Sequence, residues 1–90
     1  MNDYDPHEYL AEDLLVMIMH GRGQIARQHL YNRGKGLVVA DLVEEMLVLA
    51  ERDYWLPSEF YDDWRAVKCV EQFDTSLMKW SETFSSFAQV

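Results

Sequence analysis

Apolar residues recur along this chain with the spacing of helices rather than of strands. In residues 5–19 the apolar positions that share one helical face are Leu10, Leu14, Met17 and Ile18. Asp5 precedes Pro6, and this pair is typical of a helix start, because Asp caps free amide groups and proline fits the first turn. We therefore predict a helix that begins directly after Asp5.

Glycines punctuate the next part of the chain. Gly21 and Gly23 interrupt the apolar pattern, so the first helix either ends there or kinks and continues through residues 24–31. Gly34 and Gly36 then end this second piece, since glycine is the usual residue at a helix stop.

Three further helices follow. Residues 37–55 place Val39, Val43, Met46 and Ala50 on one face, and the wide apolar arc predicts a central position in the fold. Pro57 breaks this helix. Residues 58–73 begin at Ser58, a natural N-cap, with apolar positions at Phe60, Trp64, Val67 and Val70. Residues 74–90 begin at Asp74 or Thr75, with apolar positions at Leu77, Trp80, Phe84 and Phe87.

No segment has a convincing strand pattern, because the β-branched residues 37–40 continue into a helical period. Ninety residues are the length of one domain. We therefore predict that residues 1–90 form a single acidic all-α domain. Its four to five short helices would pack as a bundle or an orthogonal array.

Composition refines this picture. Apolar residues make up 49% of the chain and include three tryptophans, which is more than a small core needs. Surplus apolar surface is typical of a partner-binding or self-association face, so a homo-oligomer is one expectation. The single cysteine permits no internal disulfide and fits a reducing compartment. No apolar run is long enough to cross a bilayer, and the acidic opening residues do not resemble a signal peptide. We expect a cytoplasmic protein without membrane contact.

Charge is distributed unevenly. The net charge of −8 argues against direct binding of nucleic acid or membrane and favours a basic partner. However, half of the eight bases lie in residues 21–36, which contain no carboxylate; they are Arg22, Arg27, Arg33 and Lys35. We call residues 21–36 the basic segment.

The basic segment matches no phosphate-binding loop, since His29 and Gly36 replace the glycine and the hydroxyl residue that such a loop requires. It is faintly similar to a helix-turn-helix, with residues 24–30 and 37–42 as the two helices. The second of these is a poor recognition helix, because it carries apolar side chains and Asp41. The plainer interpretation is internal compensation, in which Arg27 and Arg33 pair with Asp41, Glu44 or Glu45. The sequence leaves compensation and an exposed site open.

Carboxylates interleaved with aromatic residues dominate residues 44–63. Acids in a first helical turn favour the helix dipole, but Glu51 and Asp53 fall near a helix end, where the dipole opposes them. Tyr and Trp anchor interfaces, while charge steers encounter. We predict a partner-binding set of Glu44, Glu45, Glu51, Asp53, Tyr54, Trp55, Glu59, Tyr61, Asp62 and Asp63.

No arrangement of residues indicates catalysis or metal binding. His7, His20 and His29 are dispersed, and adjacent pairs such as Asp62 and Asp63 diverge by about 100° on a helix. We therefore expect a non-enzymatic protein without cofactor or metal. Its predicted role is that of a stoichiometric inhibitor or adaptor on a basic, nucleic-acid-handling protein. It would mimic DNA, as small acidic phage proteins do. The alternatives are a nucleic-acid-binding regulator that uses the basic segment and a self-assembling protein.

Overall fold

The computed structural model describes residues 5–88. They form five helices: α1 (Pro6–Met19), α2 (Gly23–Arg33), α3 (Val39–Asp53), α4 (Ser58–Arg65) and α5 (Val70–Ala88). No strand occurs among these residues, so the predicted all-α class is confirmed. Residues 89–90 of the predicted last helix and the side chain of Phe87 lie outside the described part.

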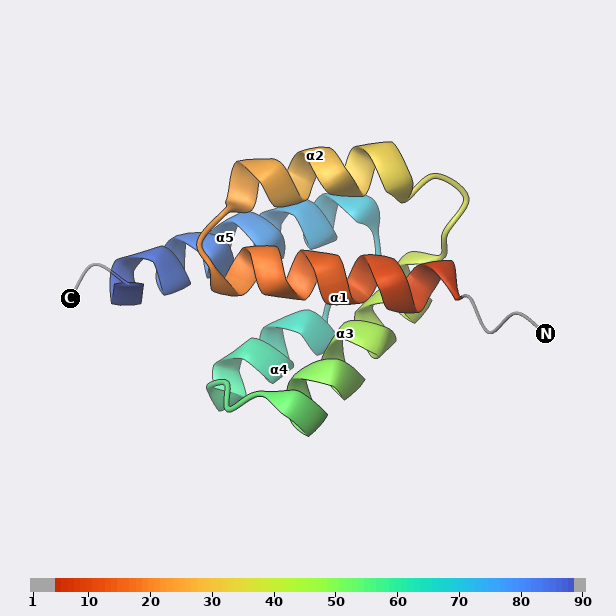
Figure 1. Ribbon diagram of the computed structural model, residues 1–90. Helices are drawn as coiled ribbons and strands as arrows, with labels where there is room; N and C mark the ends of the chain where they lie inside the picture. The colour runs from red at the N-terminus through yellow and green to blue at the C-terminus, as the bar shows by residue number, and fades with distance from the viewer. Residues whose placement is uncertain (1–4, 89–90) are drawn as a thin grey trace.

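The central helix is α1, which lies against α2, α3 and α5 (Figure 1). This corrects the prediction that residues 37–55 sit centrally. The buried residues of α1 are Leu10, Ala11, Leu14, Leu15 and Ile18. Because the adjacent residues Leu14 and Leu15 are both buried, the apolar surface of α1 spans a broad arc that one neighbour cannot cover. α3 is buried on one side only, and its outward face is acidic.

The predicted punctuation of the first two helices is confirmed. The Asp5 side chain accepts a hydrogen bond from the His7 backbone amide at 3.0 Å, as an N-cap does. α1 ends at Met19, and Gly21 turns the chain with a φ of 73° before α2 begins. The helix therefore ends at the glycines and does not kink through them. α2 ends at Arg33, with Gly34 as its C-cap.

The link between α3 and α4 begins earlier than predicted. α3 ends at Asp53, and residues 54–57 form no helix. Tyr54, the C-cap of α3, and Pro57 both have extended backbone, so the chain leaves the helical region before it reaches the proline. Pro57 occupies the N-cap position of α4, so this end of the helix has no side-chain cap. Ser58, which was predicted as the N-cap, is instead the first residue of the helix.

The predicted single helix over residues 58–73 is wrong. α4 ends at Arg65, and α5 starts at Val70, before the predicted Asp74 or Thr75. On one continuous helix Trp64 and Phe73 would lie on roughly opposite faces. Both are fully buried, and their rings meet edge to face at 4.8 Å. The turn at residues 66–69 is what allows both rings to enter one core, and the Gln72 side chain supports it by accepting from the Lys68 amide.

Aromatic rings hold α4 against α5. Phe60 is fully buried, and its ring centroid lies 5.4 Å from that of Trp80 and 6.1 Å from that of Phe84. The buried indole N–H of Trp64 has no hydrogen-bond acceptor among the described residues. That omission costs about 1–3 kcal/mol. Burying a ring of this size contributes about 4–6 kcal/mol, so Trp64 still stabilises the fold.

Two glycines with positive φ offer a matched test of helix packing. A Cβ at Gly36 (φ 82°) would meet no atom within 4 Å, whereas at Gly21 (φ 73°) it would lie 2.7 Å from Ser85 Cβ. We expect Gly36→Ala to lower the free energy of unfolding by about 1 kcal/mol, through backbone strain alone. Gly21→Ala should cost about 1–3 kcal/mol more, through overlap with α5. Chemical denaturation of both variants measures the difference. Equal losses would contradict the close approach of the α1–α2 turn to α5.

Candidate interaction surfaces

Charge is sorted onto opposite sides of α1. The stretch from α3 through α4 contains eight carboxylates against two arginines, a net charge of −6, and α2 contains no carboxylate. α2 lies above α1 and α3 lies below it in the view of Figure 1. The protein therefore has an acidic side built on α3 and α4 and a less charged, locally basic side built on α2.

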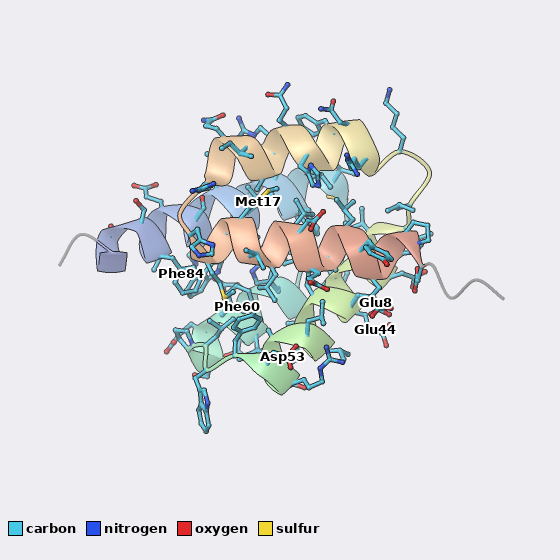
Figure 2. All side chains as sticks on the ribbon, viewed as in Figure 1. Glu8, Met17, Glu44, Asp53, Phe60 and Phe84 are labelled. Carbon is cyan, nitrogen blue, oxygen red and sulfur yellow. The ribbon has the colours of Figure 1, made fainter. Side chains whose placement is uncertain are left out.

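The outward face of α3 is the main acidic surface. Asp41 and Glu44 are exposed and form no ion pair with any described residue, and Glu45 is half-buried. The structure adds two acids of α1 that are not in the predicted set, Glu8 and Glu12. Glu8 lies near Glu44 in Figure 2. Together with Glu12 it contributes to the raised pKa of Arg52 on α3, whose main cause is the hydrogen bond to Asp53. Only the packing of α1 on α3 brings these acids together.

The α3–α4 link presents an apolar anchor among acids. We call residues 53–59 the hairpin tip. Trp55 is 103% exposed, and Tyr54 beside it is 37% exposed. Asp53 pairs with Arg52 at 3.0 Å, and this bond lowers the pKa of the Asp53 carboxyl. Glu59 is exposed and has no ion-pair partner among residues 5–88. The predicted residues Asp53, Tyr54, Trp55 and Glu59 thus share one tip.

Arg65 ties the rest of the predicted set to the fold. Its guanidinium lies 3.5 Å from Glu51 on α3 and 3.4 Å from Asp62 on its own helix. It also covers the ring of Tyr61 at 5.9 Å. Tyr61 is half-buried because its ring packs edge to face on Phe60 at 5.7 Å. Glu51 and Asp62 are therefore partly neutralised, and Tyr61 is more a support of the surface than an anchor.

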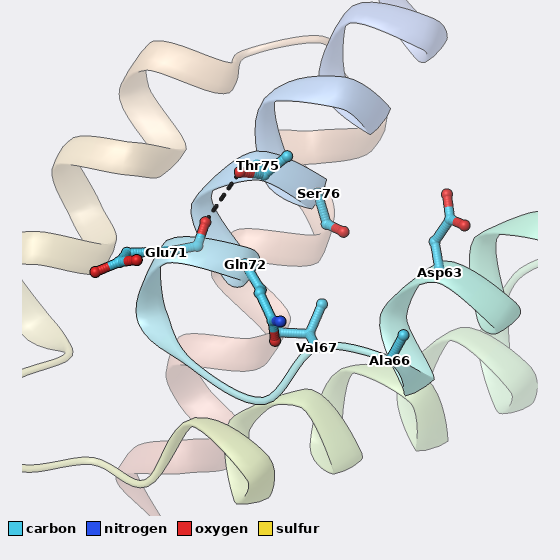
Figure 3. A pocket seen from close by; sticks show the side chains of 7 residues that line it. All are labelled: Asp63, Ala66, Val67, Glu71, Gln72, Thr75 and Ser76. Carbon is cyan, nitrogen blue, oxygen red and sulfur yellow. Dashed lines mark hydrogen bonds between the residues drawn. The ribbon is translucent and has the colours of Figure 1, made fainter.

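The structure gives Asp63 an internal role. Its Oδ2 accepts from Trp80 Nε1 at 3.0 Å and from Lys79 Nζ, which joins α4 to α5. The Lys79 bond, followed by the Trp80 bond, lowers the pKa of the Asp63 carboxyl against the opposing effect of burial. Asp63 also faces Gln72 and Ser76 across an open cleft of about 340 Å³ (Figure 3). Asp63 holds two helices together, so it does not belong to the free acidic surface.

The basic segment is divided between inward and outward residues. Arg27 makes a two-bond contact to Asp74 on α5, with N–O distances of 2.8 and 2.9 Å, and this contact raises the pKa of Arg27. The predicted pairing of Arg27 and Arg33 with carboxylates of α3 is wrong, because α1 separates α2 from α3. Arg22, Arg33 and Lys35 are exposed and have no ion-pair partner among the described residues.

The second helix of the supposed helix-turn-helix does not present a reading face. α2 packs on α1 and α5, and α3 packs on α1 and α4, so the two helices are not built as a mutually packed pair. The outward face of α3 carries Asp41 and Glu44, which would repel phosphates. Nucleic-acid contact through α3 is therefore disfavoured, and the alternative rests on α2 alone.

No protein-family model matches this chain, and no curated protein or solved structure matches it. Within residues 5–88 no helix is long and apolar enough to span a membrane. In the same residues no group of three His, Cys, Asp or Glu side chains is placed to hold a metal ion.

The Asp63 contact predicts a specific acid sensitivity. Because the folded-state pKa of Asp63 is lowered, its contribution to stability is present above the unfolded-state pKa and is lost as pH falls through the folded-state pKa. We expect Asp63→Asn to cost roughly 1 kcal/mol at neutral pH. The difference from wild type should shrink below about pH 4. Urea denaturation across this pH range measures it. Asp62→Asn is the control, because Asp62 is exposed and should change stability little at any pH. A pH-independent loss in Asp63→Asn would contradict the role of the charged contact.

Proposed function

We propose that this protein is a non-enzymatic binding protein that docks on a basic protein surface through the hairpin tip and the outward face of α3. The observation that carries the proposal is the full exposure of Trp55, while Trp64 and Trp80 are buried in the core. A fold with room for two tryptophans in its interior leaves the third on an extended link, surrounded by acids.

Trp55 has the properties of an interface anchor. Tryptophan is enriched among the few residues that dominate binding energy, because it buries a large rigid surface with few rotatable bonds. Tyr54 is its exposed neighbour, and Glu59 follows four positions later. The acids of the hairpin tip, Asp53 and Glu59, would contribute to the rate and specificity of encounter with a basic partner more than to affinity.

The arrangement of carboxylates supports a partner that normally binds nucleic acid. Asp41, Glu44, Glu45 and Glu51 lie along about 15 Å of the α3 axis, so their spacing along the axis averages about 5 Å. One DNA strand carries a phosphate about every 3.4 Å. Occupation of a phosphate-binding surface would make the protein an inhibitor or adaptor of the DNA-mimicking type known from small acidic phage proteins. A lone exposed cysteine suits a reducing compartment, so the proposed site of action is the cytoplasm.

Replacement of Trp55 tests the anchor. Trp55→Ala should change the free energy of unfolding by no more than about 0.5 kcal/mol, because the side chain is exposed. It should weaken partner binding at least about tenfold, as loss of an interface hot spot does. Affinity capture from a nuclease-treated lysate, with mass spectrometry, identifies the partner. Titration of the purified partner then measures the affinity.

The matched control is Ile25→Ala, which removes an apolar side chain of 54% exposure from α2. A basic protein retained by wild type and Ile25→Ala but lost from Trp55→Ala supports the proposal. Duplex DNA should compete for that same protein, and added salt should weaken the complex. A partner that binds Trp55→Ala as tightly as wild type, or that DNA does not displace, would overturn it.

A further inference from the structure

We propose that the outward face of α2 is a second, independent binding surface, and that its ligand is the backbone and major groove of duplex DNA. The inference does not rest on the proposed function, because its residues lie across α1 from the hairpin tip. The surface consists of the amide residues Gln24, Gln28 and Asn32 on α2 and the cations Arg22, Arg33 and Lys35 at the two ends of the helix, all of them exposed.

The cations of this face are free to act outward. Arg22, Arg33 and Lys35 have no ion-pair partner among the described residues. By contrast, each of the other exposed arginines of the described chain, Arg52 and Arg65, contacts a carboxylate. Cations that have a local partner gain little from a ligand, whereas unpaired cations can displace the counterions of a polyanion.

The carboxylates that border α2 are largely taken up by α2 itself. Asp13 on α1 accepts a hydrogen bond from His29 at 3.1 Å, and Asp74 on α5 is held by Arg27. Both contacts come from the sides of α2. Arg27 offsets the charge of Asp74, and His29 occupies one oxygen of Asp13 through a hydrogen bond. Glu82 of α5 lines the same cleft as Arg22 but does not reach ion-pair distance. A phosphate that approaches α2 from outside therefore meets unpaired cations before it meets a free acid.

Amide side chains form a stripe on the outward face of α2, between the cations at its two ends. Gln24, Gln28 and Asn32 follow one another at intervals of four residues, so they form one stripe on the helix. Asn and Gln bond base edges in the major groove in two-point contacts, and the basic residues at both ends of the stripe suit the flanking phosphates. An α-helix about 10–12 Å wide fits the B-form major groove of about 12 Å.

The net charge of −8 does not exclude this contact, because the charge is sorted. Over most of their length α2 and α3 are separated by α1, and they approach each other at the cavity that Leu30 and Lys35 share with Val39 and Leu42. At about 0.1 M salt the Debye length is about 10 Å, which screens the acidic side. Three cation–phosphate contacts predict a slope of about −2.7 for log affinity against log salt. Affinity should then fall roughly 40-fold between about 50 mM and 200 mM salt.

The test is fluorescence anisotropy of a labelled mixed-sequence DNA duplex, titrated with the full chain. The variant Arg22→Gln/Arg33→Gln/Lys35→Gln should bind at least about tenfold more weakly at about 0.1 M salt, with a slope close to zero. The matched control is Arg52→Gln/Arg65→Gln/Lys68→Gln, which removes the same charge from exposed positions outside α2. It should keep the wild-type slope. An A-form RNA duplex should bind less well, because its major groove is too narrow for side chains.

Several results would overturn the inference. One is no binding to duplex DNA at any salt concentration, and another is equal loss in both triple variants. A third is self-association that increases with concentration in sedimentation and that the α2 triple variant abolishes but the control variant does not. In that case the ligand of α2 would be a second copy of this protein. Trp55→Ala separates this inference from the proposed function, since it should leave duplex binding unchanged. Failure of the capture experiment would accordingly leave the α2 result standing.

Discussion

The burial of α1 is the constraint on which the rest of the structure depends. Its apolar arc, which includes the adjacent residues Leu14 and Leu15, must be covered from more than one side. α2 and α5 cover one part of that arc, and α3 covers another. Because α1 lies between them, the carboxylate-free α2 and the acidic α3 are held apart over most of their length. In a domain without a helix between them these opposite charges would pair with each other.

The contact between α4 and α5 determines the position of the hairpin tip. Phe60 and Trp64 enter the core from α4 and meet Phe73 and Trp80 of α5, so α4 is anchored along one face. Asp63 adds a charged contact at the edge of that face. With both flanking helices fixed, the extended link between α3 and α4 stays on the surface. Trp55 is exposed because of this anchoring, although its type alone would favour burial.

The charged residues divide into two groups by what they contact. Arg27, Asp63 and Arg65 each bridge two helices, and each is paired with an opposite charge within the fold. Glu44, Glu59, Arg33 and Lys35 are exposed without a partner among the described residues. Surface pairs add little to stability, so the second group gains little from the fold and is available for contacts outside it. This division, rather than the net charge, is the better guide to where partners bind.

The sequence by itself determined the helical class, the cap at Asp5 and the stop at Gly34, because these depend on side chains a few residues apart. It marked an interruption at Gly21 but left open whether the helix ends or kinks there. It also predicted Tyr54, Trp55 and Glu59 as partner-binding residues, from their aromatic and acidic side chains alone. Tertiary structure alone decided which helix is central and where α4 ends, since Trp64 and Phe73 must share one core. It also decided that Asp74, and not a carboxylate of α3, receives Arg27. These outcomes depend on contacts between residues distant in the chain, and a periodic pattern carries no information about which faces meet.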